Sequence, residues 1–153
     1  MLLPYHELLN SKKIILASAS PQRLKSLEMA GLKVEVSPSD FEEDLDKSDF
    51  ETTQLYVEKT SEMKLAHKIQ SLKEEGKKVD IIITGDTIVS FDNQVFEKPR
   101  DAEHVKEVMT LLNGQTHQVF TAMNICILKD GEEVERSSFT DRTDVEFYPM
   151  TEE

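Results

Sequence analysis

The stretch Ile14–Arg23, IILASASPQR, constrains the fold more than any other part of this chain. Its first four residues are all apolar, which is typical of a strand that is covered on both faces. Small residues follow, and then Pro21, which fits the first position of a helix with Ser20 as its N-terminal cap. A buried strand that runs straight into a helix predicts an α/β fold.

The next part of the chain continues this alternation of strands and helices. Gly31 ends the helix that Ser20 begins, and a longer helix is expected over residues 52–75, where apolar side chains recur at helical spacing. The other expected elements are a short helix over residues 4–10 with Pro4 at its first position, a strand over residues 34–36, and a helix that Asp101 caps and Asn113–Gly114 ends.

The second half of the chain predicts one long strand and two hairpins. Val79–Val89 is the most apolar stretch and the best candidate for a central strand. A hairpin follows with its turn at Asp92–Asn93, and a longer hairpin is centred on the turn Lys129–Glu133. A chain of 153 residues is long enough for one domain with a real core and too short for two. We therefore expect a single domain, residues 1–153, with a mixed sheet.

Charge and hydropathy exclude several classes of protein. The formal net charge of −12 argues against duplex nucleic acid or an anionic membrane as a partner, because both bind basic surfaces. No apolar run has the length of a bilayer span, and the first ten residues do not resemble a secretory signal. The lone Cys126 lies in an apolar run, as expected of a small buried hydrophobe in a reducing compartment. We expect a cytoplasmic protein, and a homodimer is compatible with this pattern.

The loop between the first strand and the first helix is a candidate anion site. A helix N-terminus presents unpaired N–H groups and the positive end of the helix dipole. Ser18 and Ser20 add hydroxyl donors, and Arg23 in the first turn reaches back toward a phosphate. An ordinary capped loop explains the same residues, and the GxxxxGK[ST] pattern of a P-loop is missing.

Two carboxylates and a threonine are candidates for chemistry. Asp86 is expected at the end of the central strand, followed by Thr87, and ligands of open α/β sheets bind where strands end. A carboxylate there holds a divalent cation or takes a proton from water. Glu43, in an acidic loop, is a candidate second metal ligand. Solvated surface acids are the alternative reading of both carboxylates.

Two lysines and four histidines complete the candidates. Lys64 borders the apolar stripe of the long helix, so its amino group either reaches a cleft or extends to solvent. Lys98 precedes Pro99, which holds its backbone extended, and a surface turn is the alternative reading. The histidines are scattered without metal-ligand spacing, which argues against zinc. Ser18 lacks the GxSxG context of a hydrolase nucleophile.

The chain resembles the Maf family of nucleoside triphosphate pyrophosphatases. The resemblance rests on the ordered fragments ILASASPQR, FEED, GDTIV, FEKPRDAEH, LLNGQTHQVFTA and TDVEF, which extend from Ile14 to Phe147. It implies a fold related to that of the inosine triphosphatases, which is an elongated mixed sheet with flanking helices and a central nucleotide cleft. It also implies a hydrolase that uses a divalent metal, Mg²⁺ or Mn²⁺, to cleave a nucleoside triphosphate into the monophosphate and pyrophosphate.

The same resemblance implies roles for individual residues. Asp86 matches the catalytic acid or metal ligand, and Glu43 matches the acidic residue after the second strand. Thr87 matches a position that follows substrate choice, and the Asp-Thr pair resembles the branch that acts on dTTP and UTP. The phosphate-binding loop is matched by Ser18, Ser20, Gln22 and Arg23, and the two lysines of the cleft by Lys64 and Lys98.

This chain departs from the family pattern in two places. Gln22 stands where the family usually has the first of two consecutive arginines, so the loop loses one cation. The family also continues past the position of Glu153 with a KAGxYGIQ-like run, so we expect a C-terminally short domain with sheet edges and apolar faces uncovered. These departures favour the alternative of a catalytically impaired Maf-like domain that binds a nucleotide or a protein partner.

Overall fold

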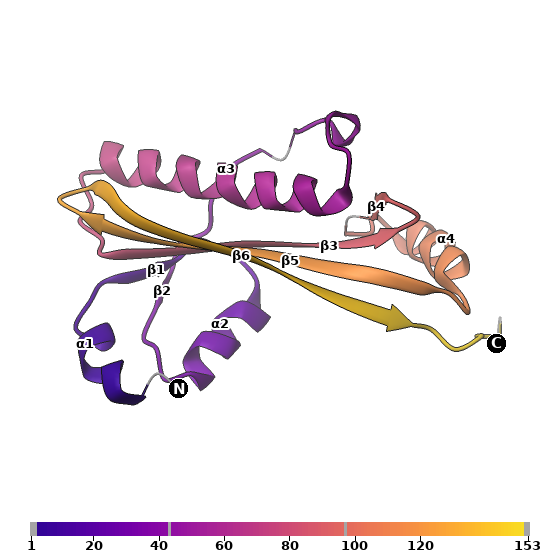
Figure 1. The fold of residues 1–153 in the computed structure, drawn as a ribbon, viewed down its shortest axis with the longest axis horizontal. Helices are drawn as coiled ribbons and strands as arrows, with labels where there is room; N and C mark the ends of the chain where they lie inside the picture. The colour runs from indigo at the N-terminus through magenta and orange to yellow at the C-terminus, as the bar shows by residue number, and fades with distance from the viewer. Residues whose placement is uncertain (1–2, 43, 97, 152–153) are drawn as a thin grey trace.

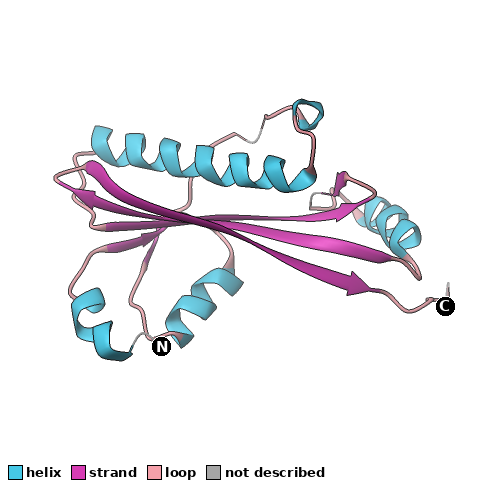
Figure 2. Ribbon diagram, in the orientation of Figure 1, coloured by secondary structure: helices cyan, strands magenta, loops and turns pink. Residues whose placement is uncertain are grey.

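The computed structural model describes residues 3–42, 44–96 and 98–151. In this part of the chain, a six-stranded mixed sheet forms a long central layer. The long helix α3 (Thr53–Glu74) covers one face of the sheet, and α1 (His6–Asn10) and α2 (Pro21–Met29) lie on the other side of the sheet (Figure 1). Figure 2 shows the sheet between these helices, with α4 (Ala102–Leu112) at one end. This architecture confirms the predicted α/β fold with flanking helices.

The sheet combines a parallel part with an antiparallel part. Its strand order is β2-β1-β3-β5-β6, and β4 pairs with β3. The β1–β2 and β1–β3 pairs are parallel, and the pairs that β3 makes with β4 and β5, and β5 with β6, are antiparallel. The strands are β1 (Ile14–Leu16), β2 (Glu35–Val36), β3 (Ile81–Phe91), β4 (Gln94–Phe96), β5 (Thr116–Lys129) and β6 (Glu132–Glu146).

Local sequence signals account for most element ends. The side chains of Ser20, Thr52 and Asp101 each accept a hydrogen bond from a backbone N–H in the first turn of α2, α3 and α4. Asp92 and Asn93 have φ angles of 48° and 58°, which is the geometry of a two-residue hairpin turn. The predicted helix over residues 4–10 was wrong in one respect. Pro4 lies in a 3₁₀ turn (Leu3–Tyr5) before α1, not at the first position of one helix.

The unequal lengths of β1 and β3 leave part of one strand edge open. β1 pairs with β3 only as far as Ile83, and β4 pairs with β3 from Val89 onward. Because β5 occupies the other edge of β3, residues 84–88 have no strand beside them on the β1 side in the described part of the chain. We call residues 84–88 the free edge of β3.

The predicted position of Asp86 was wrong. We expected this residue at the carboxyl end of the central strand, but it lies in the middle of β3. The strand continues because its second half pairs with β4 on one side and with β5 on the other. The parallel strand that ends near Asp86 is the neighbour, β1, and the ligand-binding end of the sheet is therefore beside the middle of β3.

Alternation along β3 divides its side chains between two cores. Ile82 packs with Leu65 and Leu72 of α3 on one face, while Ile83 packs with Leu24 and Leu27 of α2 on the other. By this alternation Asp86 faces the α3 side and Thr87 the α2 side. The adjacent site residues Asp86 and Thr87 of the central strand therefore face opposite sides of the sheet.

Buried polar contacts fix α3 on the sheet. The hydroxyls of Thr53 and Ser90 are 2.8 Å apart, and Asn124 Nδ2 donates to Ser61 Oγ over 2.8 Å. Buried hydrogen bonds of this kind are costly to break, so they define one rotation and one register of the helix against the strands. This register places Lys64 opposite Asp86.

The outer strand β6 is open to solvent. Most of its side chains are exposed, including the large apolar residues Val134 and Phe139. No helix in residues 3–42, 44–96 and 98–151 has the length and apolar character of a membrane span.

Truncating the core of α3 should destabilise the protein strongly. Leu65→Ala removes a fully buried side chain from the core between α3 and the sheet, and we expect a loss of about 2–5 kcal/mol in the free energy of unfolding. Urea unfolding followed by circular dichroism measures this loss. Leu55→Ala, on the exposed side of the same helix, is the control and should cost under about 1 kcal/mol. Equal losses in the two variants would contradict this packing.

The thiol of Cys126 should be protected in the folded protein. Burial raises the pKa of Cys126 from its ordinary value of 9.0 to about 11. At pH 8, labelling by a disulfide reagent should therefore be slow in the native state and fast in urea. Because the folded thiol keeps its proton to higher pH than the unfolded one, stability should fall as the pH rises from 9 toward 11. Rapid labelling of the native protein at pH 8 would show that the thiol is accessible.

Candidate active site

A cleft of about 1010 Å³ opens at the free edge of β3. Its lining comes from the segments after β1, β2 and β4, from the helices α2 and α3, and from the strands β3 and β5. Every predicted site residue that the structure describes contributes to this lining. They are Ser18, Ser20, Gln22, Arg23, Lys64, Asp86, Thr87 and Lys98. Glu43, the predicted second metal ligand, lies outside the described residues.

The loop after β1 is folded tightly against the start of α2. The N–H of Ser20 donates to Ser18 Oγ over 3.2 Å, and the N–H of Arg23 donates to Ser20 Oγ over 3.4 Å. Ser18 is buried, whereas Gln22, which also lines the cleft, is exposed. The loop therefore presents the first turn of a nine-residue helix to the cleft, which is the arrangement that binds anions.

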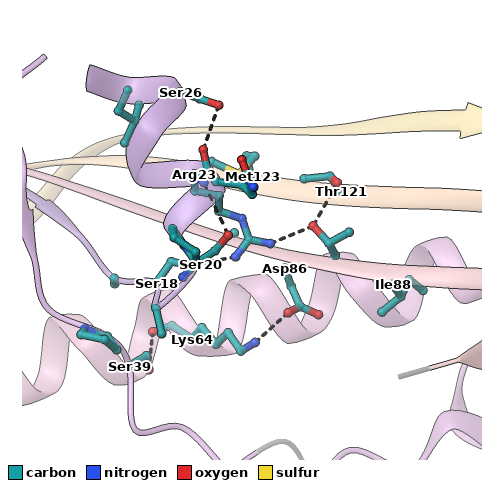
Figure 3. A pocket seen from close by; sticks show the side chains of 18 of the residues that line it. Ser18, Ser20, Arg23, Ser26, Ser39, Lys64, Asp86, Ile88, Thr121 and Met123 are labelled. Atoms are coloured by element: carbon teal, nitrogen blue, oxygen red, sulfur yellow. Dashed lines mark hydrogen bonds and ion pairs between the residues drawn. The ribbon is translucent and has the colours of Figure 1, made fainter. Parts of the chain in front are cut away.

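Arg23 connects this loop to the central strand. Its Nη1 donates to Ser18 Oγ over 2.7 Å and its Nη2 donates to Thr87 Oγ1 over 2.8 Å, so the guanidinium bridges α2 and β3 (Figure 3). Gly85 leaves room beside this bridge, because an added methyl group would clash with Met123 Sδ and would lie 3.2 Å from Arg23 Nε. These two bonds orient the planar guanidinium at the cleft, whose lining includes Arg23.

Lys64 and Asp86 form an ion pair on the other side of β3. Lys64 Nζ and Asp86 Oδ1 are 2.7 Å apart, and each side chain is 13% exposed (Figure 3). Of the two alternatives that the sequence left for Lys64, the structure shows the one in which its amino group reaches a cleft. Because both side chains are mostly buried, this contact holds the amino group and the carboxylate in one mutual orientation at the cleft.

The cleft is more basic than the protein around it. Its described lining carries three cationic side chains, Arg23, Lys64 and Lys98, against one carboxylate, Asp86. The whole chain has a formal net charge of −12. A local excess of positive charge on an acidic protein attracts an anion to the cleft and repels it elsewhere.

Sequence reasoning missed several residues of the cleft. Thr121 Oγ1 lies 3.0 Å from Thr87 Oγ1, directly across the β3–β5 pair. Ser39, in the loop after β2, donates from Oγ to the backbone oxygen of Lys64 over 3.3 Å. The alternation of β5 predicts which side chains share a face, but only the register of the strand pair shows that Thr121 lies opposite Thr87.

The described residues offer few protein ligands for a metal. They contain no cluster of three or more histidine, cysteine, aspartate or glutamate side chains that suits a metal ion. Within the described cleft lining, Asp86 is the single carboxylate that could bind a metal ion. Such a donor set fits a hard cation of the Mg²⁺ type, which takes one or two carboxylates and completes its shell with water and phosphate oxygens.

Comparison with known proteins assigns the fold and the family. The profile of the Maf-like protein family matches residues 13–153. A nucleoside triphosphate pyrophosphatase of Dictyostelium discoideum is 42% identical over 146 residues, which are 95% of this chain and 68% of that protein. A dTTP/UTP pyrophosphatase of Lachnoclostridium phytofermentans is 38% identical over 141 residues, 92% of this chain and 68% of that protein.

A solved structure shares the architecture at low sequence identity. The nucleoside-triphosphatase, or dITP/XTP pyrophosphatase, of Mycobacterium abscessus matches 88% of this chain and 73% of its own with a TM-score of 0.51 and 16% identity. This likeness confirms the predicted fold related to the inosine triphosphatases. The profile match over residues 13–153 shows that the chain belongs to the Maf-like protein family.

Proposed function

We propose that this protein is a hydrolase that cleaves nucleoside triphosphates to the monophosphate and pyrophosphate. The observation that carries the proposal is the convergence of three charged side chains on one cleft. Arg23 binds Ser18 and Thr87 from the α2 side, and the Lys64–Asp86 pair lies on the α3 side. The names of the relatives from Dictyostelium discoideum and Lachnoclostridium phytofermentans support the same chemistry.

The phosphates bind where the positive groups are. A triphosphate carries about four negative charges near neutral pH, and charge-assisted hydrogen bonds are its strongest contacts with a protein. The N-terminal turn of α2, the hydroxyl of Ser18 and the guanidinium of Arg23 receive one end of the chain of phosphates. Lys98 adds a cation from the segment after β4.

Asp86 is the group that handles the proton. In the reaction, a water oxygen bonds to the α-phosphorus, the bond from that phosphorus to the bridging oxygen breaks, and pyrophosphate leaves. The water gives up a proton in this step, and the Asp86 carboxylate accepts it. Lys64 holds the carboxylate in place through its 2.7 Å contact and stabilises negative charge that develops on the phosphates.

A divalent cation fits the donor set of this cleft. Asp86, with Glu43 as the predicted second carboxylate, would hold Mg²⁺ or Mn²⁺ together with phosphate oxygens. The cation would supply additional neutralisation of phosphate charge.

The preferred substrates are dTTP and UTP. Thr87 follows the catalytic acid, and this is the residue of the branch that acts on these nucleotides. Its hydroxyl accepts a hydrogen bond from Arg23 and pairs with that of Thr121, and Thr87 is part of the cleft lining. The named function of the Lachnoclostridium phytofermentans relative supports this preference.

Replacing the catalytic acid tests the function. Asp86→Asn keeps the size of the side chain and removes its basicity, so we expect turnover to fall by about 10²–10⁴-fold while the melting temperature stays near that of the wild type. The assay incubates protein with Mg²⁺ or Mn²⁺ and each of dTTP, UTP, CTP, GTP and ATP, and measures monophosphate and pyrophosphate. Asp141→Asn, on the exposed strand β6, is the control and should retain full turnover.

Two outcomes would contradict the assignment. Undiminished turnover in Asp86→Asn would remove this carboxylate from the chemistry. A folded wild-type protein that binds dTTP or UTP without producing pyrophosphate would instead support the alternative of a nucleotide-binding domain without catalysis.

Placing an arginine at position 22 of the phosphate loop should strengthen nucleotide binding. Gln22 lies exposed in the cleft lining, so Gln22→Arg adds a cation beside Arg23 without disturbing the core. We expect KM for dTTP or UTP to fall by about two- to tenfold, and steady-state kinetics at two salt concentrations measures the change. An unchanged KM at low salt would show that position 22 does not contact the phosphates.

A further inference from the structure

Lys68 is a buried lysine that the proposed mechanism does not use. It lies on the inner stripe of α3 with Leu65 and Leu72 and is 5% exposed. Its Nζ donates to Ser37 Oγ over 2.7 Å and to the backbone oxygen of Pro38 over 3.1 Å. Among the residues that the structure describes, no carboxylate lies within ion-pair distance of this group.

Fold stability does not explain a lysine at this position. A buried cation that has only neutral oxygen partners loses hydration that two hydrogen bonds do not fully replace. An apolar side chain of similar length would extend the core that Leu65 and Leu72 form with the sheet. The two hydrogen bonds of Lys68 therefore indicate that its role lies in the segment that it contacts, which begins with Ser37 and Pro38.

That segment is one wall of the cleft. We define the wall as Ser37–Phe41, which follows β2 and contributes Pro38 and Ser39 to the cleft lining. The N–H of Ser37 donates to the backbone oxygen of Leu16 at the end of β1. Ser39 Oγ donates to the backbone oxygen of Lys64, and the N–H of Phe41 donates to Ser39 Oγ.

The wall is held by one turn of α3. Lys64 and Lys68 are four residues apart, so they lie on the same side of the helix. Lys64 binds Asp86 through its side chain and Ser39 through its backbone, while Lys68 binds the first two residues of the wall. These contacts tie the wall to the part of α3 that carries Lys64.

We propose that Lys68 is a positioning residue that fixes the wall against the Lys64–Asp86 pair and so sets the width of the nucleotide cleft. This inference rests on the proposed function for its kinetic consequence, but its structural part is independent of it. If the wall moves, it loses contacts that it makes with the nucleotide in both the ground state and the transition state. KM should therefore change more than kcat.

The test uses Lys68→Met, which keeps the length of the side chain and removes both hydrogen bonds. We expect backbone amide exchange of residues 37–41 to accelerate by about tenfold or more, with the exchange of the α3 core unchanged. KM for the preferred nucleotide should rise by about five- to twentyfold at nearly constant kcat. Lys59→Met, on the exposed side of the same helix, is the matched control and should change neither quantity.

A second variant makes the result specific to this contact. Ser37→Ala removes one acceptor of Lys68 and no buried apolar group, so it should fold normally and raise exchange and KM by a smaller factor. In the double variant, Ser37→Ala should add nothing to Lys68→Met, because the bond is already absent. Additive effects would show that the two residues act through different contacts.

The outcomes separate this inference from the proposed function. Unchanged exchange at residues 37–41 in Lys68→Met overturns it, and so does faster exchange with unchanged KM in an active enzyme. If the wild type neither turns over nor binds nucleotides, the proposed function fails, and the exchange experiment still decides whether Lys68 fixes the wall. A parallel fall of kcat and melting temperature would assign Lys68 a purely structural role.

Discussion

The free edge of β3 is the constraint on which the rest of the site depends. β3 has eleven residues, but its parallel neighbour β1 pairs with only the first three of them. Because backbone alternation continues past this point, Asp86 and Thr87 face opposite sides of the sheet at a place where no strand covers the edge in the described chain. Groups from both helical layers can therefore meet around one edge, and a ligand can reach both.

The electrostatics of the cleft follow from this geometry. α2 brings Arg23 to Thr87 on one face, and α3 brings Lys64 to Asp86 on the other. Neither helix alone assembles the site. The polar contacts that fix α3 on the sheet, such as that of Thr53 with Ser90, are thus as important for the site as the ion pair itself. These contacts fix the position of the Lys64 backbone, from which its side chain reaches Asp86.

Much of this arrangement was predictable from the sequence because the signals are local. Ser20 before Pro21 indicated the start of α2, and a run of apolar residues indicated β3. The place of Asp86 was predicted wrongly because strand length is decided by pairing partners that are distant in sequence. Thr121 and Lys68 were missed for the same reason. Their partners, Thr87 and Ser37, lie more than thirty positions away, and nothing in the neighbouring sequence indicates such contacts.

A map of nucleotide binding on the wild-type protein tests the central claim most directly. Amide hydrogen exchange is measured with and without a saturating α,β-imido analogue of dTTP, which binds without being cleaved. If the cleft at the free edge is the nucleotide site, protection appears in the loop and first turn around Arg23 and in the wall Ser37–Phe41. Protection confined to the outer groove between α3 and β6, near Leu55 and Phe139, would contradict the account, as would no protection anywhere.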